Sequence, residues 1–130
     1  MSKKRTYTGI NIQYPISQLI LSGEKTNETR TYPIPAKYLG QDMLMIETPG
    51  KTGKFKARVV AIIRFDVCFK YKNSKDFYKD TKRHCVTPDS PWAWSDEKPK
   101  WGWQVKVVRR LKPKSVDKRL GIRFTLNLDL

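Results

Sequence analysis

The residue types best suited to chemistry lie together between positions 25 and 32, where the chain reads Lys-Thr-Asn-Glu-Thr-Arg-Thr-Tyr. The threonines, the tyrosine and the two prolines that follow favour an extended strand over residues 26–32. Side chains alternate along a strand, so one face is predicted to carry Thr26, Glu28, Arg30 and Tyr32. A carboxylate and a guanidinium on one face can pair, or can hold a polar ligand together. Lys25 comes immediately before them and is long enough to reach the same place.

Two interpretations of these side chains are open. Glu28 and Arg30 either form a buried ion pair that sets the register of the strand, or they contact a ligand. A buried lysine is costly without a partner, which favours a ligand-contacting role for Lys25. In an enzyme, Lys25 would act as a base or an electrostatic stabiliser and Glu28 as an acid or base. Thr26 would then be a third polar group of the same site.

Four tryptophans within twelve residues are the second notable feature: Trp92, Trp94, Trp101 and Trp103. Trp103 lies in a segment where apolar and polar residues alternate, which predicts a core position on a strand. Trp92 and Trp94 lie in a proline-containing loop. There they are equally suited to stacking on the bases of a single-stranded nucleic acid and to plugging the end of a small β-barrel.

The chain is strongly basic, with 27 Lys and Arg against 12 Asp and Glu and a formal net charge of +15. Residues 51–83 hold eleven basic and three acidic side chains, and residues 98–123 hold ten and one. Such an excess attracts polyanions through the release of counterions. We therefore expect RNA, another single-stranded nucleic acid or a nucleotide as the partner, with Lys70, Lys72 and Lys75 among the phosphate contacts. A surface that only confers solubility, or that binds proteins, is the alternative.

Other kinds of site find little support in the sequence. Cys68, Cys85 and the single histidine, His84, are too few and too poorly spaced for a disulfide framework or a zinc site, so no metal and no other cofactor is expected. The apolar runs are far shorter than the roughly 20 residues that a membrane-spanning helix needs. No apolar signal-peptide stretch follows the basic residues at the start, which predicts a cytoplasmic protein without a membrane segment.

The elements that must position these residues are mostly short strands. A helix is predicted between Pro15 and Gly23, because proline favours the first turn of a helix and glycine its end. A second short helix is predicted over residues 74–83, with Ser74 as its N-cap. Alternation of apolar and polar side chains predicts strands over residues 10–12, 26–32, 43–48, 55–65, 103–111 and 122–130, with a turn at 112–114.

The spacing Gly23-x-Lys25-x-x-Glu28-x-Arg30, directly after a proline-initiated helix, resembles the signature of ASCH domains, which are members of the PUA-like superfamily. A tryptophan-containing loop, a strand, a turn and a last strand resemble the C-terminal half of those domains. The resemblance therefore covers about residues 10–128. It implies a mainly β fold with short helices (α+β), built as a closed or nearly closed PUA-like β-barrel. We expect one such domain over residues 1–130, with a flexible basic N-terminus over residues 1–6.

The resemblance also implies a function. ASCH domains are regarded as RNA-binding or nucleotide-binding modules, and some small members resemble ribonucleases or amidohydrolases that remove the acetyl group from N4-acetylcytidine. In the amidohydrolase pattern a threonine stands three residues after the lysine, where this chain has Glu28, and strict alternation turns Thr29 to the other face. The expected function is nucleic-acid or nucleotide binding at a pocket around Lys25, Thr26, Glu28 and Arg30. A small hydrolase of RNA or of a modified nucleoside is the alternative.

Overall fold

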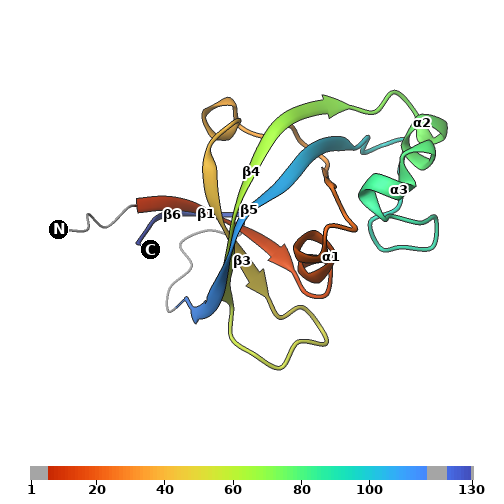
Figure 1. Cartoon of the computed structure of the whole chain (residues 1–130). Helices are drawn as coiled ribbons and strands as arrows, with labels where there is room; N and C mark the ends of the chain where they lie inside the picture. Colours follow the sequence, from red (N-terminus) through yellow and green to blue (C-terminus); the bar gives the residue numbers. More distant parts are fainter. Residues whose placement is uncertain (1–5, 117–122, 130) are drawn as a thin grey trace.

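A computed structural model provides the structure of the protein and describes residues 6–116 and 123–129. Its six strands form one mixed sheet in the order β2-β5-β4-β3-β1-β6 (Figure 1). Neighbouring strands are antiparallel except β1 and β3, which run parallel. The strands are β1 (Thr6–Gln13), β2 (Asn27–Arg30), β3 (Asp42–Thr48), β4 (Arg58–Lys70), β5 (Trp101–Ser115) and β6 (Phe124–Asp129).

The predicted mainly β fold with short helices is confirmed. The sheet is curved (Figure 1), but it is not closed within the described residues, because β2 and β6 lie at opposite ends of the strand order and do not pair. Both edge strands are short, with four and six residues, so each leaves few backbone groups unpaired. The strand that carries Glu28 and Arg30, β2, is an edge strand, and among the described strands it pairs with β5.

The central strand β4 contributes to two parts of the core. After Arg58 it has an uninterrupted apolar run over residues 59–63, which suits a strand that is covered on both faces. Ala61 and Phe65 belong to the main core cluster, whereas Val59 belongs to a second one. The predicted alternation from Phe55 to Phe65 is therefore wrong at Val59. The physical reason is a register shift in the pairing of β4 with β5, between Val59 and Ala61.

Helix α1 (Ile16–Ser22) confirms the prediction of a helix between Pro15 and Gly23. Gly23 caps it with a φ of 86°, a left-handed conformation that glycine adopts without steric cost. The hydroxyl of Ser17 donates a hydrogen bond of 2.5 Å to the carboxylate of Glu47, and this contact ties α1 to β3. The glycine cap ends the helix two residues before Lys25.

Two further helices, α2 (Ser74–Lys79) and α3 (Thr81–His84), lie beyond the ends of β4 and β5 (Figure 1). The N-cap of α2 is Asn73 and not the predicted Ser74, because the Asn73 side chain accepts the hydrogen bond from the Asp76 backbone N–H at 2.8 Å. A 3-10 helix, η1 (Ala36–Tyr38), lies between β2 and β3. No helix in the described part of the chain has the length and apolar character to span a membrane.

The C-terminal strands depart from the predicted pattern. The turn expected at residues 112–114 does not form, because β5 continues as a strand to Ser115. In β6 the predicted alternation fails at Leu126, which is 49% exposed, since Asn127 adopts a left-handed φ of 59° and the register with β1 shifts. Thr6 is the first residue of β1, so it does not belong to the flexible N-terminus that was predicted for residues 1–6. Residues 1–5, and residues 122 and 130 of the last predicted strand, lie outside the described ranges.

Candidate functional site

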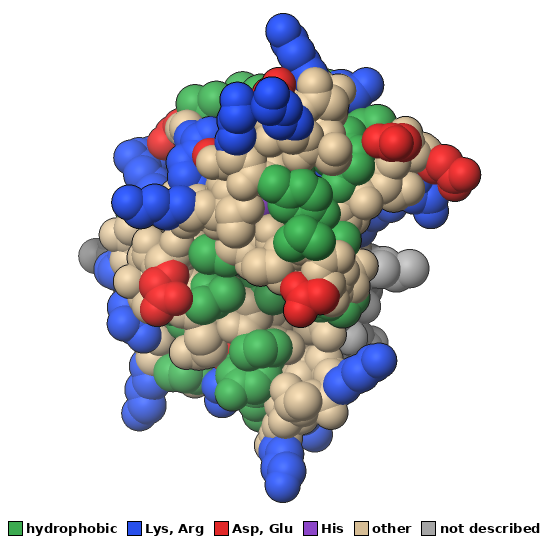
Figure 2. Space-filling view, turned by 90° about the vertical axis from the view of Figure 1, so that its right-hand side faces the viewer, with side chains coloured by type: hydrophobic (Ala, Val, Ile, Leu, Met, Phe, Trp, Pro, Cys, Tyr) green, Lys and Arg blue, Asp and Glu red, His purple; other side chains and the backbone are tan. Residues whose placement is uncertain are grey.

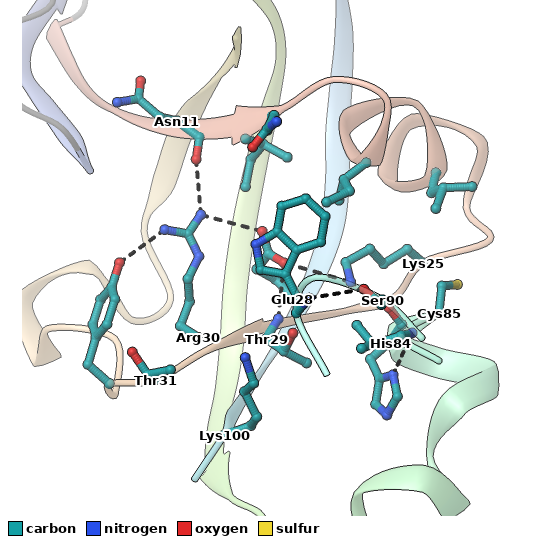
Figure 3. A pocket seen from close by; sticks show the side chains of 17 residues that line it. Asn11, Lys25, Glu28, Thr29, Arg30, Thr31, His84, Cys85, Ser90 and Lys100 are labelled. Carbon is teal, nitrogen blue, oxygen red and sulfur yellow. Dashed lines mark hydrogen bonds and ion pairs between the residues drawn. The ribbon is translucent and has the colours of Figure 1, made fainter. Parts of the chain in front are cut away.

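A cavity of about 350 Å³ lies beside β2, between β1 and α1 on one side and residues from the segment 84–100 on the other (Figure 3). This volume is at the small end of the range for ligand pockets. Apolar side chains of β1 and α1, including Ile12 and Leu19, form part of the wall. Polar side chains in the lining include Asn11, Lys25, Glu28, Thr29, Arg30, Tyr32, Ser90 and Lys100.

Lys25 reaches the cavity from the junction between α1 and β2 and is only 3% exposed. Its backbone N–H donates to the Leu19 carbonyl at 3.0 Å, which fixes the junction against the helix. Its ammonium nitrogen donates to the backbone carbonyl of His84 at 2.5 Å and lies 3.7 Å from Oε1 of Glu28. Burial lowers the pKa of Lys25 below its ordinary value of 10.5, and the carboxylate of Glu28 offsets only part of this effect.

Glu28 is shared between two cations. Its Oε1 faces Lys25 and accepts the backbone N–H of Thr29 at 3.0 Å, while its Oε2 lies 3.4 Å from Nη2 of Arg30. The guanidinium of Arg30 also donates to the hydroxyl of Tyr32 and to the backbone carbonyl of Asn11, both at 3.0 Å. Burial is the largest single influence on Arg30 and would lower its pKa, but Glu28 and Tyr32 together outweigh burial, and the pKa of Arg30 is raised. The ion pair of Glu28 and Arg30, one of the two interpretations that the sequence left open, is therefore formed at the cavity wall.

Lys100 is a cation of the cavity lining that the sequence did not predict there. It is 7% exposed and lines the cavity immediately before β5. Burial lowers the pKa of Lys100, and the positive charge of Lys25 adds to this effect while Glu28 opposes it. The antiparallel pairing that sets Trp101 opposite Arg30 brings this lysine alongside β2. No local signal marks Lys100, because its place in the cavity depends on the pairing of β5 with β2, a segment about 70 positions earlier in the sequence.

His84 contributes its backbone to the cavity more than its ring. The ring is fully buried and stacks on Phe77, with centroids 4.1 Å apart. Its Nε2 lies 2.6 Å from the Phe77 carbonyl, and its Nδ1 accepts the Val86 N–H at 2.9 Å. Burial lowers the pKa of His84, in keeping with a neutral ring that carries its proton on Nε2. Among the described residues no cluster of three or more His, Cys, Asp or Glu side chains could hold a metal ion.

The structure separates the two loop tryptophans that sequence reasoning had treated alike. Trp92 lines the cavity and is 39% exposed, so its indole is available to a ligand. Trp94 packs against Phe77, and its Nε1 donates to Asp96 at 2.7 Å. The backbone N–H of Trp94 also donates to the hydroxyl of Tyr78 at 3.1 Å. Trp94 therefore packs against the small hydrophobic cluster of Tyr71, Phe77 and Val86, whereas Trp92 belongs to the cavity.

The structure also exchanges the roles expected of two threonines. Thr26 is exposed and lines a separate depression with Asp66 and Lys106, so it does not belong to the predicted pocket. The backbone N–H of Thr26 donates to the Arg83 carbonyl at 2.9 Å. Thr26 comes just before the first residue of β2, so the alternation of side chains along the strand does not include it. Thr29, predicted to face away, is 7% exposed and lines the cavity.

The three lysines chosen as phosphate contacts lie outside the cavity. Lys70, Lys72 and Lys75 are exposed near the end of β4 and on α2, and two of them line a second depression with Asp76 and Asp80. Figure 2 views the side of the molecule that carries the helices. Lys and Arg side chains lie mainly around its margin there, and hydrophobic side chains lie toward its centre. The Lys and Arg side chains on this face thus lie mainly at its edge and not at its centre (Figure 2).

Comparison with known proteins supports the fold. No protein-family model and no curated protein matches the chain. Crystal structures of an ASCH protein from Zymomonas mobilis are similar to it, at 13% identity and a TM-score of 0.68, with 92% of this chain and 85% of that chain covered. One mutant form of the same protein has 12% identity and a TM-score of 0.68, with 94% of this chain and 90% of that chain covered. A second mutant form has 14% identity and a TM-score of 0.69, with 92% of this chain and 86% of that chain covered. The ASCH type of fold expected from the sequence is therefore confirmed.

Proposed function

We propose that this chain, with its ASCH fold, binds single-stranded RNA or nucleotides, and that one nucleotide unit occupies the cavity beside β2. The observation that carries the proposal is the charge of the cavity lining. Lys25, Arg30 and Lys100 line the cavity with a single carboxylate, that of Glu28, so basic side chains outnumber acidic ones in the lining. Water-poor surroundings strengthen the attraction of such a site for an anion.

Two further observations favour a nucleotide over other anions. Trp92 offers an exposed indole at the cavity, and stacking on an aromatic ring is the common way to hold an unpaired base. The carboxylate of Glu28 lies at the cavity wall, where its oxygens can accept hydrogen bonds from the amino or imino groups on the edge of a base. The net charge of +15 would attract the remaining phosphates of an RNA strand and would suit work among the nucleic acids of the cytoplasm.

The proposal is tested by measuring binding of ribonucleotides and of short single-stranded RNA to the wild-type chain and to Lys25→Met. Calorimetry and tryptophan fluorescence would both report binding. A Lys37→Met variant is the matched control, because Lys37 is an exposed lysine of η1 outside the cavity. We expect the control to bind like the wild type and Lys25→Met to bind at least about tenfold more weakly, the loss expected for one buried charged hydrogen bond. Wild-type protein that binds neither probe would refute the proposal.

A hydrolase acting on RNA or on a modified nucleoside is the second candidate. It is favoured by the lowered pKa of Lys25, since an amine that loses its proton more readily can serve as a general base. Glu28 lies 3.7 Å from this amine, and the hydroxyls of Thr29 and Ser90 also line the cavity. Turnover of single-stranded RNA or of N4-acetylcytidine, lost in Lys25→Met and retained in Lys37→Met, would favour this candidate. Binding without turnover would favour the first.

A further inference from the structure

We infer that the cavity selects a terminal phosphate, and that Lys100 together with Lys25 binds the phosphate group of a nucleotide or of an RNA end. The inference rests on the proposed function and names the chemical group that the site recognises. Three properties of the lining support it. Lys100 is largely buried and has no partner for its charge among the described residues, Lys25 and Arg30 already bond to protein atoms, and cationic side chains outnumber the single carboxylate.

Lys100 has the position of a ligand-binding cation. Its side chain is more than nine-tenths buried and lines the cavity (Figure 3). Within the described residues its ammonium group makes neither an ion pair within 4 Å nor a hydrogen bond, although the backbone carbonyl of Lys100 accepts the Tyr71 N–H at 3.1 Å. A lysine that is largely buried and has no partner for its charge is costly. An anion bound in the cavity would remove that cost.

The other two cations of the cavity have fewer donors to offer. Both terminal nitrogens of Arg30 already contact protein oxygens, those of Tyr32, Asn11 and Glu28. Lys25 donates to the carbonyl of His84 and faces Glu28, which leaves at most one of its three N–H groups for a ligand. Lys100 supplies three donors. The free donors of the site therefore come from Lys100 and Lys25, and they suit the several acceptor oxygens of one phosphate group.

The charge balance points to a phosphate monoester in particular. Three cations against one carboxylate leave two positive charges in the lining. A phosphate monoester carries a charge of about −1.5 to −2 at neutral pH and so neutralises the site almost completely. A nucleoside would leave both charges unpaired, and an internal phosphodiester of RNA, with a single charge, would leave one. We therefore expect affinity to increase from nucleoside to monophosphate.

Binding of each common ribonucleoside, its 5′-monophosphate and its 3′-monophosphate is compared by calorimetry. In the wild type we expect at least one monophosphate to bind about tenfold more tightly than its nucleoside, as a charged hydrogen bond implies. Lys100→Met is expected to reduce this ratio to near one. Lys98→Met should keep the ratio, because Lys98 is an exposed lysine of the same loop. The better of the 5′ and 3′ series identifies which end of a nucleotide the site takes.

The failures are distinguishable. Equal affinity of the wild type for nucleosides and monophosphates would overturn the phosphate inference and leave the proposed function standing. A preference for monophosphates that survives in Lys100→Met would overturn the assignment to Lys100. If no nucleoside, nucleotide or single-stranded RNA binds, the proposed function itself fails.

A measurement on the wild-type protein keeps the inference testable even if Lys100→Met does not fold. An anion stabilises the charged ammonium form and raises the pKa of the lysines that it contacts. Binding of a ribonucleoside monophosphate at alkaline pH should therefore take up protons, which calorimetry in buffers of different ionisation enthalpy would detect. Binding without proton uptake, at the same alkaline pH, would overturn the inference.

Discussion

The ammonium nitrogen of Lys25 lies 2.5 Å from the backbone carbonyl oxygen of His84, a residue 59 positions further along the chain. This hydrogen bond joins the junction between α1 and β2 to the end of α3, and both residues line the cavity. Lys25 therefore has a structural contact as well as a position suited to a ligand. The effects of a substitution at Lys25 on stability and on ligand binding must therefore be measured separately.

We predict that Lys25→Met lowers the free energy of unfolding by about 1–3 kcal/mol, because it leaves the buried carbonyl of His84 without its donor. Methionine retains most of the volume of the side chain, so the loss reports the polar contacts. Urea unfolding of wild type and variant measures the change. If the variant were as stable as the wild type and bound nucleotides equally well, both roles assigned to Lys25 would be wrong.

We predict that Glu28→Gln is more damaging, with a loss of about 3–5 kcal/mol, because it removes the carboxylate shared by two buried cations. Adding Lys25→Met should recover part of this loss, since one of the two stranded charges is then gone. Glu24→Gln, at an exposed position, is the matched control and should change stability little. Strictly additive losses in the double variant would argue against coupling between Lys25 and Glu28.

The loop tryptophans should separate into one that affects binding and one that affects stability. Trp92→Ala should weaken binding of single-stranded RNA by about 1–3 kcal/mol and leave the melting temperature nearly unchanged. Trp94→Ala should lower the melting temperature, because Trp94 packs on Phe77 and bonds Asp96. Thermal melts and RNA titrations on both variants provide the comparison. The opposite result, with Trp92 needed for folding, would make it a core residue.

Affinity for single-stranded RNA should fall steeply as salt rises, because phosphate contacts release counterions. Reversing Lys70, Lys72 and Lys75 to glutamate should weaken binding of all sequences alike and reduce the slope of log affinity against log salt. The matched control reverses three exposed lysines at the other end of β4: Lys51, Lys54 and Lys56. Equal losses in both triple variants would indicate that net charge alone decides binding. Affinity that does not change with salt would refute a phosphate-driven mode.

Glu47 predicts a pH dependence of stability. Burial alone would raise its pKa, but hydrogen bonds from Ser17, Gln18 and Arg58 outweigh burial, and the pKa lies below its ordinary value of 4.5. A carboxyl group with a depressed folded-state pKa stabilises the protein above pH 4.5, and this contribution is lost as the pH falls through the folded-state value. The wild type should therefore be more stable than Glu47→Gln near neutral pH.

Denaturant unfolding at a series of pH values tests this expectation. The difference in unfolding free energy between the wild type and Glu47→Gln should shrink as the pH falls below 4.5, since the wild-type carboxylate then takes up its proton. A difference that stays constant with pH would show that the charge of Glu47 does not contribute.

Local rules were sufficient for the parts of the site that depend on neighbouring residues. Proline before the helix and glycine after it predicted α1, because both act through the backbone conformation of a few residues. Alternation along a strand predicted that Glu28 and Arg30 share a side, and they form an ion pair across two positions. The alternation of apolar and polar side chains also predicted a mainly β fold, since short amphipathic strands must pack into a sheet with a covered face.

Pairings between distant segments decided the rest. Lys100 enters the cavity because β5 pairs with β2, and Trp92 differs from Trp94 because only Trp94 meets Phe77. Thr26 lies outside the cavity because β2 begins one residue later. The glycine that ends α1, the net charge and the grouping of Lys25 with Glu28 depend on neighbouring residues, and the sequence was enough to predict them. Only the tertiary structure decided which side chains from the far end of the chain complete the cavity, because register and burial depend on contacts that no local pattern encodes.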